Sequence, residues 1–184
     1  IAFWFKRKYS NCERCGRIIN LKQVYLLTPF PGIVEAVGED VKILNIGDKV
    51  SHCMVIGSYS ERMLINANKL ILLDKNTLLN IAAAATLQGL TAQYLLHESW
   101  HLKEGQTVLI HAAAGGVGLI LSQWAKHIGA RVIGTVGTEE KSEYAMKYGC
   151  DYTILYTKEN FAVKVKDITE GKGVDVIYDA IGKD

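Results

Sequence analysis

An apolar run that stops in a glycine-rich turn is the feature that most constrains this chain. Residues 108–110 (VLI) lead into residues 111–118 (HAAAGGVG), and residues 116–128 then have the spacing of an amphipathic helix. The N–H groups at a helix N-terminus are unpaired, and the helix dipole favours an anion there. Glycines let the backbone approach a pyrophosphate closely because they carry no Cβ. The sequence therefore predicts a turn that holds a dinucleotide.

The glycine pattern departs slightly from the usual G-x-G-x-x-G. Ala113, Gly115 and Gly118 occupy the three glycine positions, and Gly116 adds a further glycine after the second. The pattern indicates dinucleotide binding where a strand precedes it and a helix follows it, and both are predicted here. The alternative is a tight strand-to-helix turn without a ligand.

Strands and helices alternate along the chain after Gly105. Four strands are predicted, at residues 107–111, 131–136, 152–156 and 174–178, with helices between them. Such alternation indicates an α/β fold built on a doubly wound, Rossmann-type parallel sheet. In the usual strand order the first and fourth strands are neighbours and flank the crevice that takes the dinucleotide.

Capping residues delimit the helices of this half. Thr138 and Asn160 have side chains that can cap helix N-termini, and Gly129 is placed to end the helix over residues 116–128. The pattern of that helix predicts one apolar face, with Ser122 directed away from it. The predicted apolar face consists of Val117, Leu121, Trp124 and Ile128.

The first part of the chain has a different pattern. Short strands are predicted at residues 33–37, 49–55 and 70–73, separated by glycine-containing turns, and an Ala- and Leu-rich helix follows at residues 81–96. We therefore predict a partial β-rich domain over residues 1–78 and a nucleotide-binding domain over residues 79–184.

The predicted fourth strand lies close to the end of the sequence. Strands five and six of the usual sheet would follow it. Without them, Val174, Val176 and Ile177 would lie on an uncovered edge strand. We expect the chain to be a fragment of a longer enzyme, truncated after the fourth strand, or a decayed remnant of one.

The choice of cofactor is read at the end of the second strand of such a sheet. NAD-binding proteins place an Asp or Glu there, about 20 residues beyond the last glycine, to bind the ribose 2′-hydroxyl. This chain has Val136, Gly137 and Thr138 at that place, with Lys141 one turn into the next helix and Tyr156 at the end of the third strand. A small loop beside a cation suits the 2′-phosphate of NADPH. Alternatively, Lys141 is a solvated surface lysine that binds no ligand.

Composition excludes several other classes of protein. The 184 residues have a net charge of +2, which is too weak to indicate nucleic-acid binding, and no apolar run approaches the length of a membrane span. Four cysteines, Cys12, Cys15, Cys53 and Cys150, suit a reducing cytoplasm better than a disulfide scaffold. Cys12 and Cys15 form a C-x-x-C pair, but a structural zinc site usually needs a second pair. We predict no metal.

Three segments together resemble a known family. Residues 88–96 (QGLTAQYLL), 111–118 and 134–141 (GTVGTEEK) are similar to the NADPH-dependent quinone oxidoreductases, the zinc-free, zeta-crystallin-like branch of the medium-chain dehydrogenase/reductases. Residues 47–50 (GDKV) and 57–61 (GSYSE) resemble strand motifs of that family's GroES-like catalytic domain. The resemblance implies a partial GroES-like domain followed by the Rossmann-type domain.

The resemblance also implies which residues contact the cofactor. Thr91 would contact its nicotinamide end, and Gly137, Lys141 and Tyr156 would surround the 2′-phosphate. The residues that would line the pyrophosphate are Ala114, Gly115, Gly116 and Val117. No catalytic residue is carried over, because Ala2 stands where the family has an early Asn and residues 6–30 match none of its motifs.

The activity implied is transfer of a hydride from NADPH to a quinone or another α,β-unsaturated carbonyl, with the cofactor supplying the chemistry. Its partner would be that small molecule, and full-length members of the family are expected to form homodimers. The rival hypothesis is a non-catalytic remnant that binds NADPH or single-stranded RNA. The weak net charge and the lack of an aromatic and basic stripe argue against RNA as the main partner.

Overall fold

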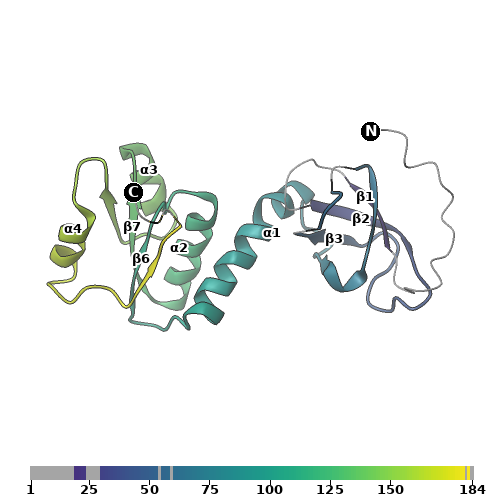
Figure 1. Cartoon of the computed structure of the whole chain (residues 1–184), viewed down its shortest axis with the longest axis horizontal. Coiled ribbons are helices and arrows are strands. Elements are labelled where there is room, and N and C mark those ends of the chain that lie inside the picture. Colours follow the sequence, from purple (N-terminus) through teal and green to yellow (C-terminus); the bar gives the residue numbers. More distant parts are fainter. Residues whose placement is uncertain (1–18, 24–29, 54, 59, 181, 183–184) are drawn as a thin grey trace. The chain divides into compact units, whose positions relative to one another are not determined.

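The computed structural model describes residues 19–23, 30–53, 55–58, 60–180 and 182. The chain divides into two compact units, residues 1–87 and 88–184, and Figure 1 labels several elements of each. Several residues discussed above, including Ala2, Cys12 and Cys15, lie outside the described part.

The first unit is built on an antiparallel sheet. Its strands are β1 (Ile19–Gln23), β2 (Phe30–Val37), β3 (Lys49–His52), β4 (Arg62–Ile65) and β5 (Ile71–Leu72), in the order β4-β1-β2-β3-β5. A 3₁₀ turn, η1 (Ala67–Lys69), connects β4 to β5. The buried side chains under the sheet form one cluster, which consists of Val34, Leu44, Val50, Met63, Ile65 and Ala67.

The sequence pattern located three of these five strands. β2, β3 and β5 overlap the predicted ranges, although β3 ends at His52 rather than at residue 55. β1 and β4 were not predicted. In β4, Met63 and Ile65 are buried while Leu64 is half exposed. Three consecutive apolar residues conceal that alternation in the sequence, and it emerges only when β4 pairs with β1.

One buried polar side chain in this unit is exceptional. The ring of His52 is fully buried and stacks on Phe30, with 5.7 Å between ring centroids. Within the described residues neither ring nitrogen has a hydrogen-bond partner. Burial lowers the pKa of His52 below its ordinary value of 6.5.

Replacement of His52 by leucine is expected to stabilise this unit and to reduce its sensitivity to acid. Burying an unpaired polar group costs about 1–3 kcal/mol, which leucine avoids. Because the pKa is lower in the folded state, the unfolded chain takes up the proton first, so stability is full above about pH 6.5 and falls as the pH drops below it. Hydrogen-exchange protection of the β2 and β3 amides at pH 7.5 and 5.5 measures both effects. Equal acid sensitivity in His52→Leu and the wild type would contradict the prediction.

The second unit contains a parallel sheet. Its strands are β6 (Thr107–Ile110), β7 (Arg131–Val136), β8 (Tyr152–Leu155) and β9 (Val176–Tyr178), in the order β8-β7-β6-β9. All three strand pairs are parallel. The order confirms the predicted 3-2-1-4 arrangement, in which the carboxyl ends of all four strands share one edge.

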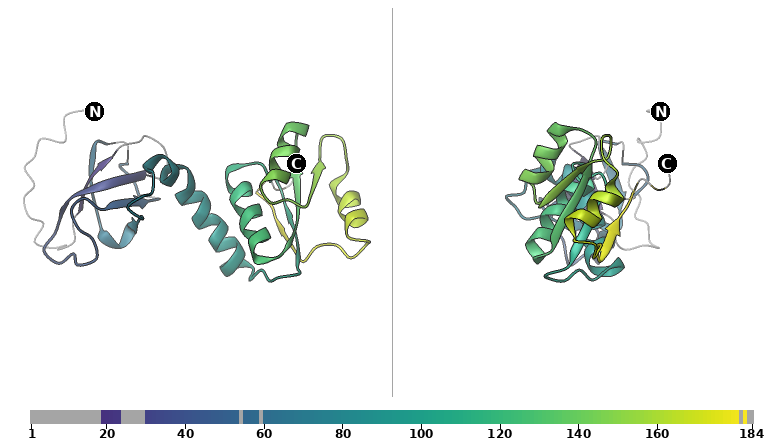
Figure 2. Two further views of the ribbon diagram at one scale, coloured as in Figure 1. Left: turned by 180° about the vertical axis from the view of Figure 1, so that it is seen from behind. Right: turned by 90° about the vertical axis from the view of Figure 1, so that its left-hand side faces the viewer.

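Helices cover both faces of this sheet, as Figures 1 and 2 show. They are the end of α1 (Leu79–Gln93) from Gln88 onward, which continues into a π-helical segment η2 (Tyr94–Ser99), then α2 (Gly116–Ile128), α3 (Glu139–Lys147) and α4 (Phe161–Ile168). On one face Val108 and Ile110 pack with residues of η2, α2 and α3. On the other face Leu109 and Ile133 pack against Val165 of α4. The result is the three-layered α/β fold that the alternating pattern predicts.

The predicted helix boundaries are largely confirmed. The hydroxyl of Thr138 accepts a hydrogen bond from Lys141 N (3.3 Å), and Asn160 Oδ1 accepts from Ala162 N (3.0 Å). Gly129 follows α2 in the left-handed conformation with φ +92°. The three residues therefore cap their helices as their side chains predict.

The prediction for Ser122 was wrong. Its side chain is fully buried, whereas Val117, Trp124 and Ile128 of the expected apolar face are only partly buried. The turn before β8 causes this, because a Cβ on Gly149 would lie 2.8 Å from the Ser122 carbonyl oxygen. The hydroxyl of Ser122 also accepts a hydrogen bond from the Cys150 thiol (3.6 Å). Helical periodicity alone cannot show this contact.

Candidate functional site

The glycine-rich turn begins at the carboxyl end of β6. Ala112 adopts a left-handed conformation (φ 52°), which reverses the chain, and its carbonyl oxygen accepts a hydrogen bond from Gly115 N (2.8 Å). Ala113 N donates to Thr135 O of β7 (3.1 Å). The first bond closes the turn on itself and the second anchors the turn to β7, so that α2 starts close to the end of β6.

Gly118 permits the close approach of α2 to this turn. A Cβ on Gly118 would lie 2.8 Å from Ala113 Cα and 2.9 Å from its carbonyl carbon, closer than side chains approach backbone atoms. The third glycine of the motif is therefore required by helix–strand packing, which is its usual role in a dinucleotide-binding turn.

Ala113 is accommodated by a second glycine across the sheet. Its side chain is fully buried, and a Cβ on Gly134 of β7 would lie 2.6 Å from the Ala113 methyl group. The same Cβ on Gly134 would also lie 2.7 Å from the Cys150 sulfur. A glycine in β7 therefore makes room for the alanine that replaces the first glycine of the motif.

The N-terminus of α2 is open to a ligand. Gly115 is its N-cap and makes no side-chain hydrogen bond, so the first N–H groups of the helix are not capped by a side chain. Gly115 and Gly116 are exposed, whereas Ala114 and Val117 are partly buried. The four residues predicted to line the pyrophosphate are thus contiguous around a helix N-terminus, a favourable place for an anion.

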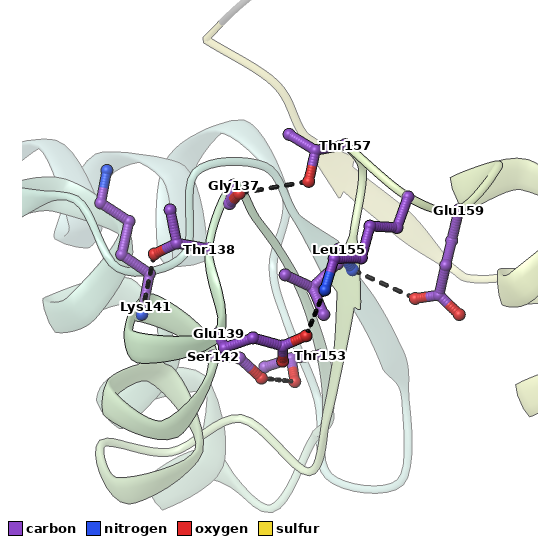
Figure 3. A network of polar contacts seen from close by, with 10 residues as sticks. Gly137, Thr138, Glu139, Lys141, Ser142, Thr153, Leu155, Thr157 and Glu159 are labelled. Atoms are coloured by element: carbon purple, nitrogen blue, oxygen red, sulfur yellow. Dashed lines mark hydrogen bonds and ion pairs between the residues drawn. The ribbon is translucent and has the colours of Figure 1, made fainter.

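A second group of predicted residues lies where β7 and β8 end (Figure 3). A Cβ on Gly137 would lie 2.8 Å from the Tyr156 hydroxyl oxygen, so these two residues are neighbours. Thr157 Oγ1 donates a hydrogen bond to Gly137 O (3.2 Å) and holds the two strand ends together. Lys141 is exposed on the first turn of α3, beside Thr138.

Some charged side chains around this second group form ion pairs with each other, whereas Lys141 forms none with the described residues. Lys158 Nζ pairs with Glu139 Oε1 at 2.8 Å, and this hydrogen bond raises the pKa of Lys158. Glu159 pairs with Lys164 at 3.0 Å, and that bond lowers the pKa of Glu159. No carboxylate of the described residues forms an ion pair with Lys141. Its ammonium group is therefore available to an incoming anion.

The last residues of α1, from Gln88 to Gln93, lie in the same unit as the turn, and two of them concern the site. Thr91 is partly buried, and Gln88, three residues earlier, has its side chain against Gly116. We assigned Gln88 no role from the sequence, because a glutamine in an apolar helix has no distinctive pattern. His111 is hydrogen bonded through Nδ1 to Thr135 Oγ1 (2.9 Å) and contacts Phe161 edge-to-face.

Known proteins with similar sequences agree with this arrangement. The family described as zinc-binding dehydrogenase matches residues 116–184. The chain is 46% identical to quinone oxidoreductase of Pseudomonas aeruginosa over 154 residues, and 44% identical to quinone oxidoreductase 1 of Escherichia coli over 158 residues. These alignments cover 83% and 85% of this chain. The chain belongs to the quinone oxidoreductase type of medium-chain dehydrogenase/reductases.

Another relative and a solved structure extend the comparison. A 2-haloacrylate reductase of Burkholderia sp. is 52% identical over 155 residues, covering 83% of this chain and 46% of that protein. The crystal structure of Escherichia coli quinone oxidoreductase complexed with NADPH has a TM-score of 0.85 at 36% identity, and the match covers 97% of this chain and 62% of that one. The chain spans about half the length of the curated relatives it matches.

The described residues contain no group of three His, Cys, Asp or Glu side chains that could hold a metal ion. Of the two cysteines in that part, Cys150 is buried, which raises the pKa of its thiol, and Cys53 is partly buried. Because Cys12 and Cys15 are not described, the absence of zinc stays a prediction. Among the described residues, no helix has the length and apolar character needed to span a bilayer.

A depression of about 420 Å³ lies at the opposite edge of the sheet, where β7 and β8 begin. Its charged groups are already paired: Lys126 with Asp151, and Arg131 with the Ile168 carbonyl oxygen at 3.0 Å. Asp151 also accepts a hydrogen bond from Val132 N (2.8 Å). By contrast, the N-terminus of α2 and Lys141, which has no ion pair among the described residues, are both at the carboxyl edge, where doubly wound sheets bind ligands.

Proposed function

We propose that this chain carries the NADPH-binding part of a reductase that transfers a hydride to an electron-poor carbon–carbon double bond conjugated to a carbonyl or carboxyl group. The observation that carries the proposal is the backbone cradle at the start of α2, where Gly118 leaves no room for a side chain. Identities of 44–52% with quinone and haloacrylate reductases support the same reaction class.

The described residues fit NADPH at two points. The open N-terminus of α2 offers N–H groups to the pyrophosphate, and residues 114–117 surround it. Lys141, which forms no ion pair among the described residues, suits the 2′-phosphate together with Gly137 and Tyr156. No acidic residue stands at positions 136–138 to bind a free 2′-hydroxyl. Thr91 is proposed to contact the nicotinamide end.

The proposed roles of the cofactor and of the protein follow from these positions. When bound, the cofactor supplies the hydride, and the protein binds and orients it. The α2 backbone would bind the pyrophosphate and Lys141 would bind the 2′-phosphate. The adenosine half of the cofactor would then be fixed at both points, and this would orient the nicotinamide. Quinones and 2-haloacrylates, the compounds in the names of the relatives, share the conjugated double bond that accepts a hydride at carbon.

Titration of the chain with NADPH and with NADH, followed by nicotinamide fluorescence, tests the cofactor assignment. We expect saturable binding with at least tenfold preference for NADPH, because a charge-assisted hydrogen bond to the phosphate contributes about 1.5–3 kcal/mol. Equal affinity for the two cofactors would contradict it. Oxidation of bound NADPH by 1,4-benzoquinone or 2-chloroacrylate then tests the substrate class, and no oxidation by either would argue for the non-catalytic alternative.

The remaining parts of the proposal concern the partner and the cell compartment. A small molecule is the proposed partner. Homodimer formation and a cytoplasmic location are further expectations, supported by the family and by the cysteine usage. Light scattering of the purified protein would test the dimer directly.

A further inference from the structure

The side chain of Gln88 lies against the first residue of α2. A Cβ on Gly116 would be 3.5 Å from Gln88 Cγ and 3.6 Å from Gln88 Nε2. Both residues belong to the second unit, although Gln88 comes from α1. The amide of Gln88 is therefore held beside the backbone that is proposed to take the pyrophosphate.

One end of this amide is unsatisfied. Gln88 Oε1 is buried, and no group of the described chain donates a hydrogen bond to it. A glutamine side chain can accept two hydrogen bonds and donate two. A buried carbonyl oxygen without a donor is unfavourable, and native proteins rarely keep one unless a ligand or another group completes it.

The chemistry of the amide selects the part of the ligand that completes it. A carbonyl oxygen accepts hydrogen bonds only, so a phosphate oxygen cannot satisfy Oε1, whereas a ribose hydroxyl can. The Nε2 group donates and suits a phosphate oxygen. A dinucleotide has both groups next to each other, because its ribose hydroxyls lie on the sugars that flank the pyrophosphate.

The position on α1 indicates which sugar is contacted. Gln88 and Thr91 are three residues apart in the helix and so share a face. Thr91 is the residue proposed to contact the nicotinamide end, whereas the adenosine residues Gly137 and Lys141 lie beyond the end of β7. We infer that Gln88 is a further cofactor-binding residue, which hydrogen bonds the nicotinamide ribose and the adjoining phosphate. This inference rests on the proposed function.

Two ligands separate this role from a structural one. NADPH contains the nicotinamide half, whereas adenosine 2′,5′-bisphosphate contains only the adenosine half with its 2′-phosphate. We expect Gln88→Leu to weaken NADPH binding about tenfold, the effect of losing one hydrogen bond to a charged group. Gln88→Glu should weaken it further, because its carboxylate repels the pyrophosphate. Affinity for adenosine 2′,5′-bisphosphate should stay within about twofold for Gln88→Leu.

Stability without a ligand provides the second measurement. Leucine removes the unsatisfied oxygen, so Gln88→Leu is expected to unfold at the same temperature as the wild type or at a higher one. Gln123→Leu is the matched control, since Gln123 is exposed on α2 and bonds only to Leu119 O in the described structure. That control should bind NADPH like the wild type.

Three results would overturn the inference. Unchanged NADPH affinity in Gln88→Leu would show that the amide does not contact the cofactor. Equal losses for both ligands, together with a lower unfolding temperature, would show that Gln88 only supports the turn. Failure of the wild type to bind either ligand would instead refute the proposed function and the inference with it.

Discussion

Gly118→Ala is expected to destabilise the second unit and to abolish tight NADPH binding. The added methyl group would meet the Ala112 carbonyl oxygen and lie 2.8 Å from Ala113 Cα. These are backbone atoms of the turn itself, so relief requires α2 or the turn to move. Overpacking of this kind costs about 1–3 kcal/mol of unfolding free energy. Urea denaturation followed by circular dichroism measures the loss, and fluorescence titration measures NADPH binding.

Two other glycines make controls for this substitution. A Cβ on Gly89 of α1 has no atom within 4 Å, so Gly89→Ala should stabilise the chain by up to about 1 kcal/mol through helix propensity. A Cβ on Gly116 makes only ordinary contact with Gln88, so Gly116→Ala should fold normally and weaken cofactor binding alone. If Gly118→Ala were as stable as Gly89→Ala, the tight packing of α2 on the turn would be wrong.

Lys141→Glu is expected to remove the preference for NADPH over NADH. Within the described residues the Lys141 ammonium forms no ion pair, and we propose that it binds the 2′-phosphate. Loss of one charge-assisted hydrogen bond corresponds to about 1.5–3 kcal/mol, or roughly 10- to 100-fold in NADPH affinity. Repulsion by the new carboxylate adds to this loss, whereas NADH, which lacks the 2′-phosphate, should bind about as well as before. Parallel titrations with both cofactors give the ratio.

Lys147→Glu is the matched control for this charge reversal. Lys147 is at the other end of α3, where its ammonium group lies over the Tyr148 ring at 5.5 Å. The same change in net charge there should leave the NADPH preference intact. If Lys147→Glu reduced NADPH affinity as much as Lys141→Glu, the effect would come from overall charge, and Lys141 would not be a phosphate ligand.

The sequence was most informative in the second half of the chain. The caps at Thr138 and Asn160 and the stop at Gly129 follow from local rules, because hydrogen bonds within a few residues produce them. The order of strands follows from the alternation of strands and helices, which restricts how parallel strands can be connected. The position of the glycine turn between β6 and α2 follows from the same rules. The sequence also predicts the choice of cofactor, since that choice depends on residue types at a known distance from the turn, and the parallel titrations with NADPH and NADH test the prediction.

The first half was less predictable because its strands depend on partners distant in the chain. β1 pairs with β4 across about 40 residues, from Ile19 to Ile65 in the extreme case, and three consecutive apolar residues obscure the alternation of β4. Likewise, His52 is buried without a polar partner among the described residues, which could not be read from its place in a short strand. Pairing register, not local propensity, decides which side of such a strand is covered.

The sequence by itself determined the kind of fold and the chemistry of the glycine turn, because both depend on local periodicity and on the absence of side chains. Only the tertiary structure decided which atoms occupy the space that the missing side chains leave. It showed that Gly134 makes room for Ala113, that Ser122 is buried against the turn at Gly149, and that Gln88 packs on Gly116. Each of these contacts joins residues at least 20 positions apart, and the close packing of elements, which no local pattern encodes, brings them together.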